Sequence, residues 1–160
     1  MPAPSALQPS SSPERGSEAR GSDSIGHGRP SRAPFRGVGM RQRVLLVEDD
    51  FMLRAHLAEL LMAEGYQVSC AADGEEALMR LLREPLPFAI ILDIVMPRLD
   101  GVGFRRRQMT FPELTGIPTI ALTATRDLED LSHLAFERVL KKPANIDGLI
   151  ETLAQLGPSA

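Results

Sequence analysis

The stretch Ile90-Ile91-Leu92-Asp93-Ile94-Val95-Met96-Pro97-Arg98-Leu99-Asp100-Gly101 decides the fold. Its apolar start, led by Phe88 and Ala89, is too short for an ordinary helix and is bounded by proline. Such a run is typical of a strand buried on both faces of a parallel sheet. An ionised carboxylate is costly inside a core unless it is paired or binds a metal, so we expect Asp93 at the carboxyl end of this strand, where open α/β sheets place their sites. Taken alone, the stretch fits a strand with an incidental acid in the following turn equally well.

The composition restricts the class of protein. The 160 residues fit one domain, 43% of them are apolar, and a net charge of −3 does not indicate a generally basic nucleic-acid binder. No apolar run approaches the ~18 residues of a membrane span, and the N-terminus lacks the apolar core of a signal peptide. The one cysteine, Cys70, is expected to act as a small buried hydrophobe. These features favour a cytoplasmic protein without nucleic-acid or membrane partners.

Residues 1–40 differ in composition from the rest of the chain. Pro, Ser, Gly and Arg dominate this segment, large apolar side chains are few and no periodicity is present, so we expect a disordered tail. The folded domain is predicted over residues 41–157, followed by a short tail over 158–160. The tail 1–40 reads as an inert leader or as a basic tether, and the dispersed Arg residues favour the leader. Met40 is an alternative start of the natural protein.

Strands and helices alternate along residues 41–157. Short apolar runs predict strands, and apolar residues spaced by three or four positions predict helices. Five such alternations imply a parallel sheet with helices on both faces. The predicted strands are 44–47, 66–70, 88–92, 117–122 and 137–140, and the predicted helices are 51–64, 75–83, 102–109, 126–135 and 146–156.

Two of these helices carry further expectations. Arg105-Arg106-Arg107 on helix 102–109 is expected to form a solvated face, and a docking patch for an acidic partner is the less favoured alternative. Helix 75–83 is expected to turn four apolar residues towards the core, namely Ala77, Leu78, Leu81 and Leu82.

Chemically reactive side chains follow the predicted strands. Glu48 and Asp49 come after the first strand, Asp93 after the third, Thr123 after the fourth and Lys142 after the fifth. The carboxyl ends of parallel strands meet at one edge of a sheet, so we expect these residues to lie together. Adjacent carboxylates need a cation, and all-oxygen ligands favour Mg²⁺. A nucleophilic Asp, a divalent metal, a lysine and a hydroxyl form a minimal phosphoryl-transfer site.

Over residues 44–156 the sequence resembles the receiver domain of two-component response regulators. The matching motifs are Glu48-Asp49, LDIVMPRLDG around Asp93, ALTAT with Thr123, and LKKP with Lys142-Pro143. The resemblance implies a flavodoxin-like (βα)5 fold, with a doubly wound parallel five-stranded sheet in the order 2-1-3-4-5. It also implies that Asp93 accepts a phosphoryl group from a histidine kinase or a histidine phosphotransfer protein.

The same resemblance implies a role for each acid. Mg²⁺ is expected to be held by Asp49, Asp93 and the backbone carbonyl of Val95, with Glu48 acting through water. A receiver catalyses only its own phosphorylation and dephosphorylation, so the chain is not expected to be an enzyme acting on other substrates.

The remaining family positions concern phosphoryl binding and switching. Thr123 and Lys142 are expected to bind phosphoryl oxygens, the Lys142–Pro143 peptide bond is expected to be cis, and Pro143 belongs to the switch and interface positions. Three residues before the lysine the family usually has Tyr or Phe, which turns inward as a switch. Val139 occupies that position here and has no ring to move.

Two further departures concern the fourth helix and the lifetime of the phosphoryl group. The segment between Thr123 and Lys142 is shorter than is common, so the fourth helix is expected to be short or irregular and the output surface atypical. Val95 and Thr125 flank the phosphoryl group in this family. Neither is a carboxylate or an amide that orients water, so slow autodephosphorylation is expected.

Three functions are compatible with these residues. The favoured one is a stand-alone receiver, monomeric or a weak homodimer, that signals to a downstream protein target through contacts, since only residues 157–160 follow the last predicted helix. The alternative is a docking or scaffold module that does not switch; Val139 favours it, and the intact site residues oppose it. The third is a small phosphatase with an Asp nucleophile, which requires a second acid where Val95 stands.

Overall fold

The computed structural model of the chain describes residues 41–124 and 129–157. The predicted tails 1–40 and 158–160, Thr125, and the start of the predicted helix 126–135 lie outside the described residues.

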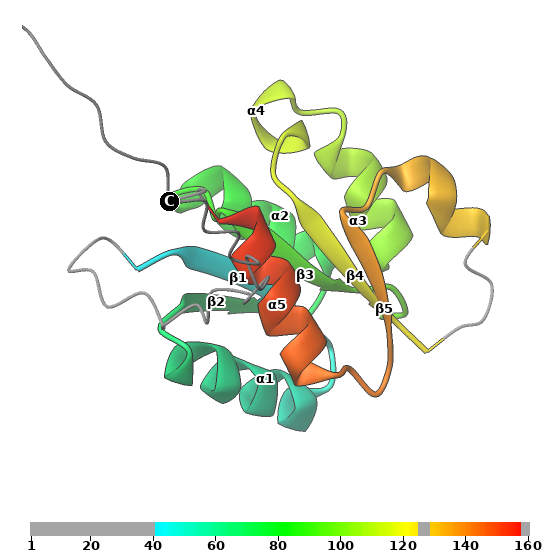
Figure 1. Cartoon of the computed structure of the whole chain (residues 1–160). Helices are drawn as coiled ribbons and strands as arrows, with labels where there is room; N and C mark the ends of the chain where they lie inside the picture. The colour runs from blue at the N-terminus through cyan, green and yellow to red at the C-terminus, as the bar shows by residue number, and fades with distance from the viewer. Residues whose placement is uncertain (1–40, 125–128, 158–160) are drawn as a thin grey trace, which may run out of the picture. The chain divides into compact units, whose positions relative to one another are not determined.

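Five parallel strands form one sheet in the order β2-β1-β3-β4-β5 (Figure 1). This order confirms the expected doubly wound, flavodoxin-like arrangement. The elements along the chain are β1 (Arg43–Val47), α1 (Phe51–Ala63), β2 (Gln67–Ala71), α2 (Gly74–Arg83), β3 (Ala89–Asp93), α3 (Gly101–Gln108), α4 (Pro112–Thr115), β4 (Thr119–Thr123), the 3₁₀-helix η1 (Glu129–Leu134), β5 (Arg138–Lys141) and α5 (Ile146–Leu156).

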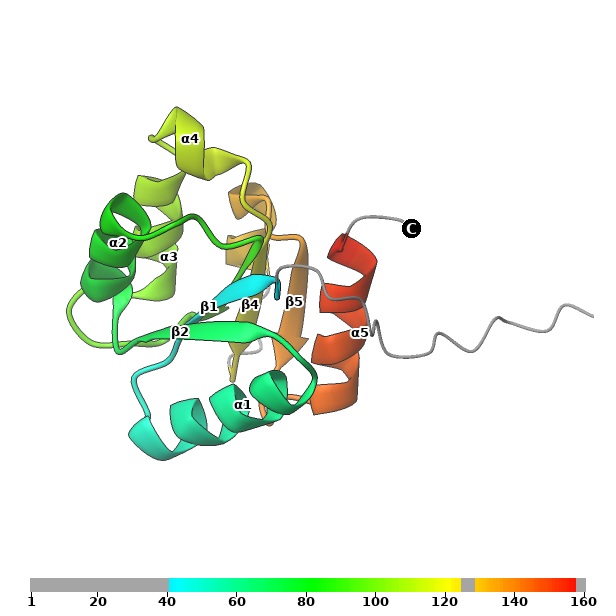
Figure 2. The same ribbon diagram turned by 90° about the vertical axis from the view of Figure 1, so that its left-hand side faces the viewer.

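Helices cover both faces of the sheet. Figures 1 and 2 show α1 and α5 on one face and α2 and α3 on the other. Along β3, Ile90 and Leu92 pack towards α2 and α3, whereas Ile91 packs towards α1 and α5. Because successive side chains of a strand point to opposite faces, an unbroken apolar run is what two covered faces require. Among the described residues, no helix has the length and apolar character needed to cross a membrane.

Several acidic side chains cap the N-termini of helices. Asp50 accepts a hydrogen bond from the backbone N–H of Leu53 at the start of α1, and Asp100 accepts one from Gly103 at the start of α3. Such N-caps satisfy backbone donors that have no partner within the helix. Capping therefore explains the presence of one acid after β1 and one after β3. It does not explain Glu48, Asp49 or Asp93. At the other end of α1, Gly65 adopts a left-handed φ of 94°, a conformation that glycine adopts readily after a helix.

The connection from β4 to β5 differs from the prediction of an α-helix over 126–135. The described part is the 3₁₀-helix η1, which buries Leu131 and Leu134 and is followed by Ala135 at a φ of 48°. A 3₁₀-helix rises about 2.0 Å per residue, against 1.5 Å for an α-helix, so a connection of few residues can cover a greater length. The expectation of a short or irregular helix is confirmed. The four-residue α4, which begins with Pro112, was not predicted.

Three expectations about side-chain burial need correction. Leu82 is 58% exposed, because the inward stripe of α2 consists of Ala77, Leu78 and Leu81, and the next position turns towards solvent. Cys70 on β2 is only partly buried, although it packs against the core cluster of α1 and α5. Arg105, predicted on a solvated face, is 4% exposed.

The buried guanidinium of Arg105 joins three elements of the fold. Its donors reach the end of η1, the neighbouring turn of α3 and the start of β4, and burial lowers the pKa of the group from its ordinary value. An arginine nevertheless stays protonated in proteins, so these neutral acceptors compensate a buried cation. The acceptors are the backbone oxygens of Leu134 (2.9 Å) and Ala135 (2.7 Å) and the side-chain oxygens of Gln108 (2.8 Å) and Thr119 (3.1 Å).

Replacing Arg105 with Met is expected to lower the free energy of unfolding by about 2–4 kcal/mol, because several buried acceptors lose their donor at once. The matched change Arg106→Met, on the exposed side of the same helix, is expected to stay within about 0.5 kcal/mol of wild type. Urea unfolding of the three proteins measures both values. Equal midpoints for Arg105→Met and wild type would show that this network does not stabilise the fold.

Candidate functional site

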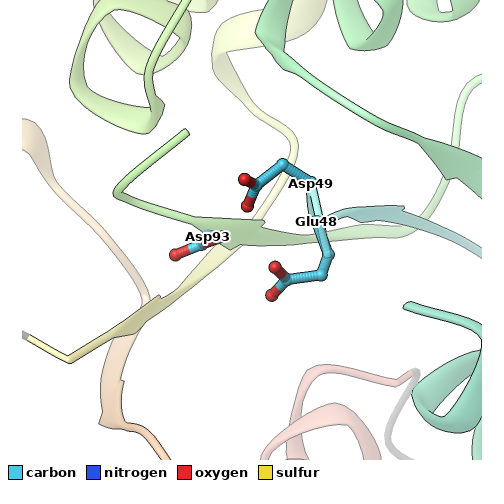
Figure 3. A group of neighbouring side chains, drawn as sticks. All are labelled: Glu48, Asp49 and Asp93. Carbon is cyan, nitrogen blue, oxygen red and sulfur yellow. The ribbon is translucent and has the colours of Figure 1, made fainter. Parts of the chain in front are cut away.

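Three carboxylates meet where β1 and β3 end (Figure 3). Glu48 and Asp49 follow β1, Asp93 is the last residue of β3, and one oxygen of each lies within 4.8 Å of the others. The parallel register pairs Val47 with Leu92, so the next residue of each strand is an acid. Neighbouring strands of the sheet thus bring together acids that stand more than forty positions apart in the chain.

Lys142, which follows the edge strand β5, contributes a positive charge to this cluster. Its Nζ lies 2.7 Å from Oε2 of Glu48 and 3.1 Å from Oδ2 of Asp93. The residue directly follows β5, and its backbone N–H donates to the carbonyl oxygen of Thr123 at 2.8 Å. The Lys142–Pro143 peptide bond is cis, as the family resemblance implied.

Burial and charge act against each other in this cluster. Glu48 and Asp93 are 1% and 3% exposed, and burial raises the pKa of both carboxyl groups although their contacts with Lys142 oppose the rise. Burial alone would lower the pKa of Lys142, but its hydrogen bonds to the two carboxylates outweigh this and raise the pKa. Three carboxylates against one ammonium leave an excess of negative charge, which favours the binding of a further cation.

The donor set fits a hard divalent cation. Every candidate ligand is an oxygen, and Asp49 is exposed, so an ion can enter from solvent. Both oxygens of Glu48 already have partners, because Oε2 accepts from Lys142 and Oε1 accepts from the backbone N–H of Asp50 at 3.1 Å. Glu48 therefore contributes charge and holds Lys142. The two oxygens of Asp93 also have partners, in Lys142 and the backbone N–H of Val95, so the exposed Asp49 is the carboxylate most open to a direct bond with an ion.

The other predicted site residues lie on or just after β3, β4 and β5. Thr123 is buried at the end of β4, and Pro143 is exposed beside Lys142. The side chain of Val95 is 60% exposed, and its backbone N–H donates to Oδ1 of Asp93 at 3.2 Å. Val139, at the usual aromatic position, is partly buried in a cluster that includes the ring of Phe136.

Residues that were not predicted to belong to the site fix the conformation of the loop after Asp93. A Cβ on Gly101 would lie 2.5 Å from the carbonyl oxygen of Asp93, so this position admits no side chain without a backbone shift. Arg98 adopts a left-handed φ of 63°, and its guanidinium pairs with the buried carboxylate of Asp73 at the start of α2. Asp73 and Arg98 are 25 positions apart, and no local pattern signals such a pair.

Comparisons with known proteins agree with this geometry. The family model "Response regulator receiver domain" matches residues 44–154. The transcriptional regulatory protein CrdR of Helicobacter pylori is 34% identical over 114 residues, which cover 69% of this chain and 52% of CrdR. The probable transcriptional regulator ycf27 of Guillardia theta is 40% identical over 90 residues, which cover 56% of this chain and 34% of that protein. The alignments thus span about a third to a half of these relatives.

Solved structures of response regulators have a similar fold. The chemotaxis response regulator CheY4 of Vibrio cholerae superposes with a TM-score of 0.67 at 28% identity, covering 73% of this chain and 99% of CheY4. TrrA of Thermotoga maritima, solved in complex with Mg²⁺ and BeF, has a TM-score of 0.66 at 32% identity, covering 72% of this chain and 99% of TrrA. The family match, the strand order and the acid cluster together show that this chain belongs to the receiver domains of two-component response regulators.

Proposed function

We propose that this receiver accepts a phosphoryl group on Asp93 from a histidine kinase or a histidine phosphotransfer protein. One observation carries the proposal: the Asp93 carboxylate lies 3.1 Å from the ammonium of Lys142 and within 4.8 Å of the carboxylates of Glu48 and Asp49. A purely structural ion pair needs one acid for each lysine. The two additional acids concentrate negative charge around a potential nucleophile, which is the arrangement that metal-assisted phosphoryl transfer uses.

The residues divide the chemistry among them. A carboxylate oxygen of Asp93 attacks the phosphorus atom, an O–P bond forms, and the N–P bond to the donor imidazole breaks with its electron pair staying on nitrogen. Lys142 and the hydroxyl of Thr123 donate hydrogen bonds to phosphoryl oxygens, and the ammonium of Lys142 also neutralises charge there. Mg²⁺ supplies further positive charge when it is bound by Asp49, Asp93 and the carbonyl of Val95. A nearby cation also favours the ionised form of Asp93, which offsets the effect of burial on its pKa.

The signal is proposed to leave the domain through protein contacts in the cytoplasm. CrdR and the ycf27 protein are named as transcriptional regulators, and the aligned region covers about half and a third of their lengths. Signalling without an output domain, as a monomer or weak homodimer, stays a prediction. The alternative of a docking module that does not switch rests on Val139, which replaces the ring of the usual switch.

Incubation with acetyl phosphate and Mg²⁺, followed by intact-mass measurement, tests the phosphoacceptor role. Wild type is expected to gain the mass of one phosphoryl group, and Asp93→Asn is expected to gain none because the nucleophilic oxygen is lost. Asp100→Asn is the matched control: it changes an acid of the same stretch, and asparagine caps a helix as well as aspartate does. A folded wild-type protein that binds Mg²⁺ without gaining this mass would favour the docking module.

The decay of this adduct tests the role of Val95. An exposed aliphatic side chain two residues after Asp93 does not orient water, so slow hydrolysis is expected. Val95→Asn places an amide there and is expected to shorten the lifetime several-fold, whereas Val95→Ile is expected to leave it near the wild-type value. Equal lifetimes for the asparagine variant and wild type would contradict this role.

A further inference from the structure

Arg54, near the start of α1, contacts the main chain that carries the acid cluster. Its Nη1 donates to the carbonyl oxygen of Glu48 at 2.5 Å and lies 3.4 Å from the carbonyl oxygen of Asp49. These two residues provide two of the three carboxylates that meet at the ends of β1 and β3. The guanidinium therefore bridges two successive peptide groups of the segment that carries Glu48 and Asp49.

An aromatic ring keeps the guanidinium near these carbonyls. The central carbon of the Arg54 guanidinium lies over the ring of Phe51, 5.7 Å from its centroid, which is within the range of a cation–π contact. Phe51 is 69% exposed, so its ring contributes little to the core and is free to face this arginine. Arginine suits the task because its planar group presents several donors in a fixed geometry.

The loop needs such a restraint because its acids repel one another. Glu48 is held through its side chain by Lys142, and Asp50 is held as the cap of α1. Asp49 lies between them with an exposed side chain, so the direction of its carboxylate depends on the main chain on either side. Arg54 contacts this main chain at both the Glu48 and the Asp49 carbonyls.

We propose that Arg54 is a positioning residue for the divalent-cation site, in that it holds the peptide between Glu48 and Asp49 so that the Asp49 carboxylate faces Asp93. The inference rests on the proposed function, because it assumes that Mg²⁺ binds there. Arg54 touches neither the phosphoryl group nor the metal in this account and acts through the backbone of the ligands.

Electrostatics and positioning predict opposite effects when Arg54 is replaced. Removing a positive charge beside a cation site strengthens Mg²⁺ binding by Coulomb's law. Removing the backbone restraint weakens binding, by about tenfold for residues that orient metal ligands. Titration of the full-length protein with MgCl₂ by calorimetry is therefore expected to show a Kd about tenfold higher for Arg54→Met than for wild type. Arg54→Lys keeps the charge but carries it on a shorter side chain with a mobile, strongly hydrated ammonium, so it is also expected to bind Mg²⁺ more weakly.

Two controls separate positioning from damage to the fold. Arg106→Met, on the exposed side of α3, is expected to leave the Kd unchanged. At saturating Mg²⁺, phosphorylation of the Arg54 variants by acetyl phosphate is expected to return to the wild-type extent, because Asp93 and Lys142 are intact. If Arg54→Met does not fold, the lysine variant provides the same comparison.

The outcomes distinguish this inference from the proposed function. Wild-type affinity or tighter binding in Arg54→Met and Arg54→Lys, with Mg²⁺-dependent phosphorylation of wild type, would overturn the positioning role alone. A wild-type protein that neither binds Mg²⁺ nor accepts a phosphoryl group would overturn the proposed function and the positioning role with it.

Discussion

The ammonium of Lys142 between two buried carboxylates is the interaction on which the site depends. Glu48 and Asp93 are almost fully buried, and each ionised group costs several kcal/mol to desolvate unless it is paired. The parallel sheet provides the pairing, because β1, β3 and β5 all end at the same edge. Lys142, directly after β5, reaches both acids there. A single ammonium nevertheless serves two carboxylates, and Asp49 adds a third nearby.

Without a bound metal ion, this excess of negative charge lowers the stability of the folded state. Because burial raises the pKa of Glu48 and Asp93, the folded state holds their protons more tightly than the unfolded state does. Their contribution to stability is therefore complete below the unfolded carboxyl pKa and is lost as the pH rises through the folded pKa. Ionisation of the two buried acids therefore destabilises the fold, and a bound cation offsets this. Functional sites commonly carry such a cost.

The elements that the sequence predicts are those with local signals. The unbroken apolar run of β3 and the acids after β1 and β3 follow from strand geometry and parallel topology, so the meeting of Glu48, Asp49 and Asp93 could be foreseen. The burial of Arg105 could not, since the next two residues are exposed arginines and its backbone acceptors, Leu134 and Ala135, lie 29 and 30 residues away. Arg54 was likewise missed, because a contact to main-chain oxygens leaves no mark in the pattern of side chains.

Thermal unfolding at neutral pH, with and without MgCl₂, tests the central claim that repulsion in the acid cluster is relieved by a cation. Without metal, Asp93→Asn is predicted to unfold a few degrees above wild type, because the variant removes one buried charge while Glu48 keeps Lys142 paired. Mg²⁺ is predicted to raise the unfolding temperature of wild type more than that of the variant, relative to NaCl at equal ionic strength. A metal-free Asp93→Asn protein no more stable than wild type, together with equal Mg²⁺ shifts for the two proteins, would contradict this claim.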